Sequence, residues 1–182
     1  RVLRFWNNDV LNNTDDVLRE VFIPGLRNAH AVEHQAMALL GRQIDRAKNY
    51  PEVEEKLISH RQETEVQIDR LEGVLRGLDE DPSALKDAAM TLSGNMAAIG
   101  HAFADDEVLK NAFANFAFEN FEAACYQSLI VLAKRGGFSA TLDPLQATLA
   151  EEEAMADWVK TSLPDLTNKF VDLKAAGENA SR

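Results

Sequence analysis

The chain has 182 residues, of which 46% are hydrophobic and 27% charged, which allows a core of domain size and argues against global disorder. Acidic residues outnumber basic ones 30 to 19, and the formal net charge is −11. Such a surface repels phosphate backbones and anionic lipid headgroups, so we expect no nucleic-acid binding and no membrane binding. A cation is the more natural partner.

The one cysteine, Cys125, excludes an intrachain disulfide and a cysteine-rich zinc site. No apolar run approaches the roughly 18 residues that a membrane span needs. The start of the chain lacks the layout of a signal peptide and has no initiator Met, which indicates a trimmed start. From these features we expect a soluble, cytoplasmic protein.

Helical periodicity runs through almost the whole chain, and β-branched residues never alternate as they would in strands. Cap residues that begin at Thr14 predict a first long helix, which ends near Asn49. Pro24-Gly25 lies in its early turns and predicts either a kink or a short separate leading helix. Pro51 suits a first helical turn and opens a second helix that ends near Leu78.

The second half of the chain predicts two more long helices. Residues 83–103 form a weaker, Ala- and Gly-containing crossover, for which we expect one short helix. The third long helix begins at Asp105-Asp106 and ends at Gly136-Gly137. The fourth begins at Ser139 or Thr141, and we expect Pro164 to end it.

Short links join the first two long helices and the last two, so each pair should form an antiparallel hairpin. Bundles with one long crossover between such hairpins belong to the ferritin-like class, whereas cytokine-type bundles need two long connections. We therefore predict an all-α, ferritin-like antiparallel four-helix bundle over residues 14–164. An N-terminal extension would occupy residues 1–13 and a C-terminal tail residues 165–182.

Each predicted long helix has an apolar stripe that a glutamate interrupts near mid-length. These glutamates are Glu33, Glu63, Glu122 and Glu152. In the second helix, the pattern leaves open whether Glu63 or Thr64 faces inward, and likewise Gln67 or Ile68. Antiparallel packing brings the four glutamates to a similar height. Four buried and unpaired carboxylates would cost several kcal/mol each, and bound divalent cations would neutralise them.

The glutamates therefore predict a buried site for two divalent cations. His30 and His60 lie three residues before Glu33 and Glu63, on the same helix face, and are candidate nitrogen ligands. The alternative for each glutamate alone is an edge residue whose head reaches water, and for His60 a hydrogen-bonded core residue. If the site exists, the four carboxyl groups should lie within about 8 Å of one another, because paired metals are roughly 3.5–4 Å apart.

Four segments of the chain carry a family resemblance. They are LRNAHAVEHQA at 26–36, HRQETEVQIDRLE at 60–72, ENFEAACY at 119–126 and LAEE at 149–152. In order and spacing they resemble the YciE/YciF family of bacterial stress proteins, over roughly residues 17–163. The resemblance implies a ferritin-like bundle with a rubrerythrin-like di-iron centre. It also implies a dimer, the common state in this family. A ferroxidase activity is often attributed to this family.

Carried onto this chain, the resemblance implies a set of metal ligands and close neighbours. The set comprises Glu33, Glu63, Glu122 and Glu152, with His60, Gln67 and Glu119 close by. The chain departs from the family pattern at Asn28, His30, Asn120 and Ala156, where the family has Asp, Tyr, His and often Asp. The last two departures remove groups that could ligate a metal or orient its ligands. His30 could compensate by adding a nitrogen donor beside Glu33.

The function that we expect first is a carboxylate-bridged dimetal protein, a ferroxidase or one that reacts with O2 or peroxide, with two Fe ions or Mn as the alternative. Tyr126 would be a redox or hydrogen-bonding neighbour. The alternative is a non-catalytic helical stress or interaction protein with a degenerate metal site. An oxygen-dominated site with few imidazoles is weak, so we expect that it can be recovered empty. The aromatic residues Phe5, Trp6 and Phe113 to Phe118 predict a homodimer or a larger oligomer.

Overall fold

A computed structural model of the chain describes residues 14–81 and 105–181. These stretches form four long α-helices and a short 3-10 helix, and no strand occurs in them. The elements are α2 (Thr14–Arg46), α3 (Pro51–Gly77), α5 (Glu107–Arg135), η3 (Ser139–Thr141) and α6 (Leu142–Ala175). The short helix expected in the crossover and the extension at 1–13 lie outside the described residues.

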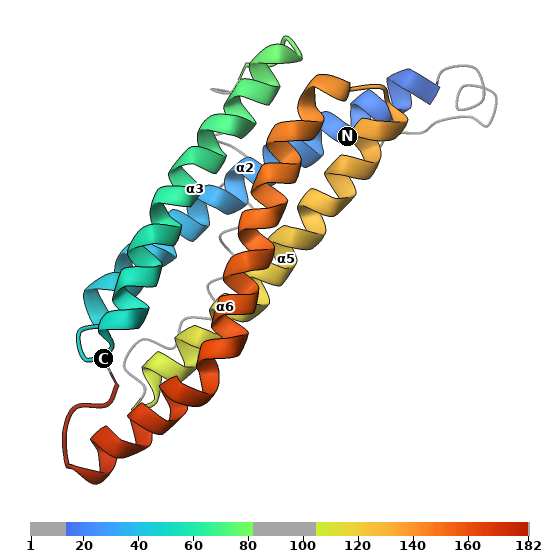
Figure 1. Cartoon of the computed structure of the whole chain (residues 1–182). Coiled ribbons are helices and arrows are strands. Elements are labelled where there is room, and N and C mark those ends of the chain that lie inside the picture. Colours follow the sequence, from blue (N-terminus) through green and yellow to red (C-terminus); the bar gives the residue numbers. More distant parts are fainter. Residues whose placement is uncertain (1–13, 82–104, 182) are drawn as a thin grey trace.

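The four long helices form a ferritin-like bundle of two antiparallel hairpins, α2 with α3 and α5 with α6 (Figure 1). Helix α2 also packs against α5, and α3 packs against α6. Each helix therefore has two neighbours and turns one stripe of side chains toward a shared interior. The predicted all-α four-helix bundle is confirmed, and none of the described helices is apolar enough over a sufficient length to cross a membrane.

The ends of the helices follow the local chemistry of the chain. Pro51 occupies the first turn of α3 together with Glu52 and Glu54, whose charges favour the positive end of the helix dipole. Helix α5 ends with Lys134-Arg135, which suit the negative end. Gly137 follows with a φ of 70°, a left-handed conformation that glycine adopts without strain.

The structure contradicts the prediction for the end of the last helix. Helix α6 continues through Pro164 to Ala175. Proline inside a helix loses a backbone hydrogen bond and costs roughly 3 kcal/mol or more. The turns beyond it are nevertheless held, because Leu166 is buried against Tyr50 and Val108, and because the Tyr50 hydroxyl donates a hydrogen bond of 2.6 Å to the Ala180 carbonyl oxygen.

Helix α2 likewise runs unbroken through Pro24-Gly25, so there is no separate leading helix within the described part of the chain. On one side of mid-height, an apolar cluster contains Leu26 of α2 and Leu129 of α5. On the other side, a second cluster contains Leu40 of α2 and Met155 of α6. The level between these two clusters is where the polar interior residues lie.

Candidate metal centre

Five buried polar side chains converge between the two apolar clusters, and we call them the central cluster. They are Glu33 of α2, His60 of α3, Glu119 and Glu122 of α5, and Glu152 of α6. Each is at most 3% exposed. They occupy one level because antiparallel neighbours bring mid-helix positions together, as the interrupted stripes predict.

His60 is the residue about which the nearest carboxylates are arranged. Its Nε2 atom lies 3.1 Å from Oε2 of Glu119 and 3.9 Å from Oε2 of Glu152. One ligand atom from each of these three residues lies within 4.8 Å of the other two. Two ligands of one divalent cation are separated by roughly 3–4 Å when each lies about 2.0–2.2 Å from the metal. The trio therefore has the spacing of a cation site.

Several carboxyl oxygens of the central cluster have no hydrogen-bond partner although they are buried. They are Oε2 of Glu33, Oε1 of Glu122 and both oxygens of Glu152. Buried polar atoms are normally paired, and orphaned ones call for an explanation such as an ion. Oxygen-rich donors with one imidazole suit divalent iron or manganese, so the trio fits a site for a divalent cation.

The carboxyl groups are shifted toward their protonated forms in the protein without metal. Burial raises the pKa of Glu33 to about 7, although the Tyr126 hydroxyl and the charge on His60 oppose the shift. Burial, together with the nearby Glu119, raises the pKa of Glu152 to about 11. Burial and the charges of Glu33 and Glu152 raise the pKa of Glu122 well above its usual value. Without cations, this site therefore holds protons.

The pKa values of His60 and Tyr126 are also shifted, by burial and by the carboxyl groups around them. Burial disfavours the imidazolium of His60, but Glu119 and Glu63 outweigh burial, and the pKa of His60 is raised. The Tyr126 hydroxyl donates a hydrogen bond to Oε1 of Glu33, and burial raises the pKa of Tyr126 well above its usual value. The predicted hydrogen-bonding position of Tyr126 is thus observed.

An ion pair beside the central cluster links α3 to α6. The Arg70 guanidinium donates to both carboxylate oxygens of Glu151, at 2.6 and 2.9 Å. Gln67 donates its Nε2 hydrogen to Oε2 of Glu151 at 3.0 Å, while its buried Oε1 has no hydrogen-bond partner. Gln67 was predicted to lie close to the site, and its side-chain carbonyl oxygen is one further, uncharged ligand atom for a metal. Sequence reasoning missed the Arg70–Glu151 pair, because Glu151 reads as part of a solvated acidic run.

Two sequence-predicted ligands lie at the margin of the central cluster. The Glu63 side chain is 35% exposed, and its Oε2 atom lies 3.1 Å from Nδ1 of His60. The fully buried neighbour in that turn is Thr64, whose hydroxyl donates to the His60 carbonyl oxygen. His30 is buried, but its Nε2 atom faces Glu72 at 3.5 Å, and its ring packs edge-on against that of His34. Whether Glu63 or His30 binds a metal stays a prediction.

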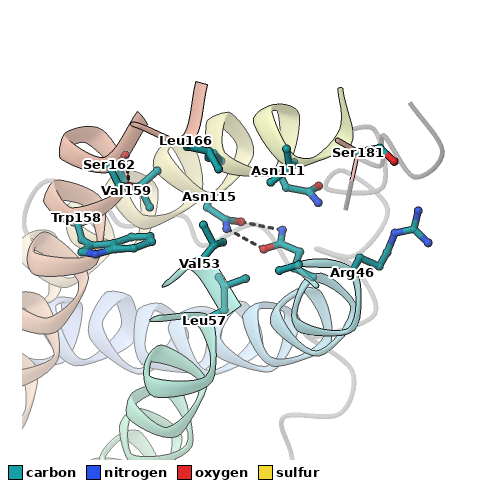
Figure 2. A pocket seen from close by; sticks show the side chains of 14 residues that line it. Arg46, Val53, Leu57, Asn111, Asn115, Trp158, Val159, Ser162, Leu166 and Ser181 are labelled. Carbon is teal, nitrogen blue, oxygen red and sulfur yellow. Dashed lines mark hydrogen bonds between the residues drawn. The ribbon is translucent and has the colours of Figure 1, made fainter. Parts of the chain in front are cut away.

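A pocket lies at the end of the bundle where α2 meets α3 (Figure 2). The Gln43 and Asn115 amides exchange two hydrogen bonds across it, at 2.9 and 2.8 Å. Among its lining residues Arg46 is the one ionisable group, and it pairs with the buried Glu107. None of the central cluster lines this pocket. This pocket is therefore not part of the candidate metal centre.

Comparison with known proteins agrees with this architecture. A family model described as "Domain of unknown function (DUF892)" matches residues 17–172. Among solved structures, a protein from Xanthomonas campestris is 23% identical with a TM-score of 0.73, and covers 87% of this chain and 98% of its own. YcfI from Rhodopseudomonas palustris is 26% identical with a TM-score of 0.65, covering 86% and 98%. The E. coli stress protein YciF is 22% identical with a TM-score of 0.69, covering 84% and 98%.

Proposed function

The chain belongs to the DUF892 family, as its resemblance to the YciE/YciF proteins predicted, and from its buried centre we propose that it binds two divalent cations. Iron is the first choice and manganese the alternative, because the donors are mainly carboxylate oxygens. The observation that carries the proposal is the buried trio of His60, Glu119 and Glu152, whose ligand atoms lie within 4.8 Å of one another. The orphaned oxygens of Glu33 and Glu122 extend this trio toward a second ion.

Bound iron would supply one-electron chemistry toward O2 or peroxide, which makes the protein a ferroxidase or peroxide-reactive stress protein. The stress role rests on the name of the E. coli stress protein YciF. The chain's own residues hold and orient the ligands. His60 offers Nε2 while Glu63 contacts its other nitrogen. Tyr126 orients Glu33 through its hydrogen bond, and the apolar clusters above and below exclude water.

The second candidate is a non-catalytic helical stress protein whose metal site is degenerate. It is favoured by the single imidazole of the central cluster and by the two departures in α5 and α6. Asn120 is exposed and donates its amide hydrogen to the Phe116 carbonyl oxygen. Ala156 has no donor atom. Metal analysis of freshly purified protein separates the two candidates, because a degenerate site would hold no stoichiometric iron or manganese.

The test is an anaerobic Fe(II) titration of wild-type protein and of a matched pair of variants in α6. Glu152→Ala removes a buried carboxylate of the central cluster and should abolish Fe(II) binding. Glu153→Ala removes the adjacent exposed carboxylate and should leave binding unchanged. Fe(II) uptake by Glu152→Ala equal to that of wild type would end the proposal. If binding holds, consumption of O2 or peroxide by the loaded protein tests the redox function.

A further inference from the structure

Outside the central cluster, two histidines of α2 and a glutamate of α3 lie where these helices pack against each other. His30 and His34 are four residues apart on α2, which places them on one helix face, one turn apart. Their rings are in contact, with centroids 4.5 Å apart. Glu72 of α3 faces His30 from the neighbouring helix. Two histidines at this spacing on a helix are a common arrangement for binding zinc.

The separation of His30 and Glu72 is unusual for a hydrogen bond. Nε2 of His30 lies 3.5 Å from Oε1 of Glu72, longer than the 2.7–3.2 Å of an ordinary hydrogen bond. His30 is only 5% exposed, and this nitrogen has no hydrogen-bond partner. Two ligands at about 2.0–2.2 Å from one tetrahedral zinc ion are roughly 3.4 Å apart. The gap is thus close to the one that a shared cation requires.

The charges of the three residues also favour a cation. Burial and the neighbouring His34 lower the pKa of His30, which keeps its imidazole neutral and its lone pair available. The Arg76 guanidinium donates to Oε2 of Glu72 at 3.0 Å, so Oε1 is left to face His30. This contact, more than the others, lowers the pKa of Glu72. The carboxylate is therefore charged, and its second oxygen is already satisfied.

We propose that His30, His34 and Glu72 form a second metal site, separate from the central cluster, that binds one Zn²⁺ ion or a cation of similar ligand preference. Two imidazole nitrogens and one carboxylate oxygen are the ligands of known zinc sites that keep a fourth, open position. His34 is exposed, so its side chain can turn to bring its nitrogen to the ion without disturbing the core. The same exposure provides the entry path and leaves the fourth position to water.

The site differs chemically from the central cluster, and this difference makes the two separable. The central cluster has one imidazole among carboxylates, whereas the proposed site has two imidazoles and one carboxylate. More nitrogen donors favour zinc, copper and nickel over manganese. His30 then belongs to this second site rather than to the central one, with Glu33 one turn further along α2 bound to Tyr126.

The experiment is a competition titration of Zn²⁺ against a chromophoric chelator, with the full chain. His34→Ala changes an exposed residue. The variant should bind one zinc ion fewer, or bind that ion with an affinity at least tenfold lower. Glu72→Gln should lower the affinity for the same ion. Glu55→Gln is the matched control, since it removes one exposed negative charge from the same helix, and it should bind zinc as wild type does. Circular dichroism confirms that each variant keeps its helices.

Glu152→Ala distinguishes this site from the central one. The variant should retain the ion that depends on His34, whatever happens to metal at the central cluster. In ¹⁵N-labelled Glu152→Ala protein, added zinc should shift the imidazole signals of His30 and His34 together. Zinc uptake by His34→Ala that equals wild type in number and affinity would overturn the proposal. Imidazole signals of His30 and His34 that do not respond to zinc would overturn it too.

Discussion

The carboxyl groups of the central cluster could bind cations, but their burial in charged form lowers the stability of the protein without metal. Glu33, Glu122 and Glu152 lie where an apolar side chain would pack well, and each has an elevated pKa because burial disfavours its charge. In protein without metal, protons neutralise them, whereas bound cations would take the place of those protons. Metal affinity should therefore rise with pH, and stability without metal should fall.

The first prediction concerns the pH dependence of stability in chelator-treated protein. Burial raises the pKa of Glu33 from 4.5 to about 7, so the folded state binds more protons than the unfolded state between these values. The stabilisation is complete below pH 4.5 and is lost as the pH rises through 7, a difference of up to roughly 3 kcal/mol. Glu33→Gln, measured by urea unfolding from pH 4.5 to 7.5, should make this decline shallower, while Glu122 and Glu152 still contribute to it.

Glu153→Gln is the control for that measurement, because it makes the same chemical change at an exposed position of α6. It should leave the decline in unfolding free energy as it is in wild type. A Glu33→Gln protein whose stability still falls with the wild-type slope would show that Glu33 is not the group that titrates.

The second prediction concerns Glu122, which is 2% exposed and has an orphaned carboxyl oxygen. Leaving a buried polar atom without a partner costs about 1–3 kcal/mol. Glu122→Ala should therefore raise the free energy of unfolding of metal-free protein at pH 8, despite the small cavity that it creates. Urea unfolding checks this value. A less stable Glu122→Ala protein would show that the carboxyl group has partners in the folded state.

At the level of whole helices, Gly25 of α2 lies close to Leu129 of α5. A Cβ atom added to Gly25 of α2 would lie 2.8 Å from Cδ2 of Leu129 on α5, too close for undisturbed packing. Leu129 is itself buried in the apolar cluster next to the central one. Gly25 therefore leaves room for Leu129 at this contact and does not break the helix.

The third prediction tests this packing. Gly25→Ala should destabilise the protein by about 1–2 kcal/mol, because the clash with Leu129 exceeds the gain in helix propensity. Gly41→Ala lies on the same helix, where an added Cβ meets nothing within 4 Å, and should stabilise the protein by up to about 1 kcal/mol. Thermal unfolding of both variants checks the signs. Equal effects of the two substitutions would contradict the close approach.

For the molecule as a whole, we propose a homodimer. Large aromatic side chains of α5 remain exposed on the single chain, with Phe113 at 55% and Phe121 at 50%. Exposed apolar side chains that gather on one helix often mark a protein–protein interface. The net charge of −11 opposes non-specific association, so a dimer would have to be held by a specific apolar surface.

The fourth prediction is the mass in solution. Light scattering should give twice the chain mass of 20.2 kDa. Phe113→Ser should shift the equilibrium toward the monomer, because it removes an exposed aromatic ring. A control substitution at an exposed polar position such as Asp157 of α6 should leave the mass unchanged. Chain-mass scattering of the wild type at every concentration would refute the dimer.

The amino-acid sequence by itself determined the four helices, their order and the glutamates that interrupt their apolar stripes. These are properties of neighbouring residues, since helical periodicity and the chemistry of helix ends act within a few positions. The burial of Glu33, Glu122 and Glu152 follows directly from them. The family assignment also came from local motifs, such as the segment at 60–72.

Only the tertiary structure decided which side chains meet across the bundle. The rotation of α3 buries Thr64 and leaves Glu63 at the margin. The register of α3 against α6 pairs Arg70 with Glu151, residues 81 positions apart. Packing of Leu166 carries α6 past Pro164, where local propensity predicted an end. The rotation and register of a helix depend on all of its neighbours at once, so no local pattern contains them.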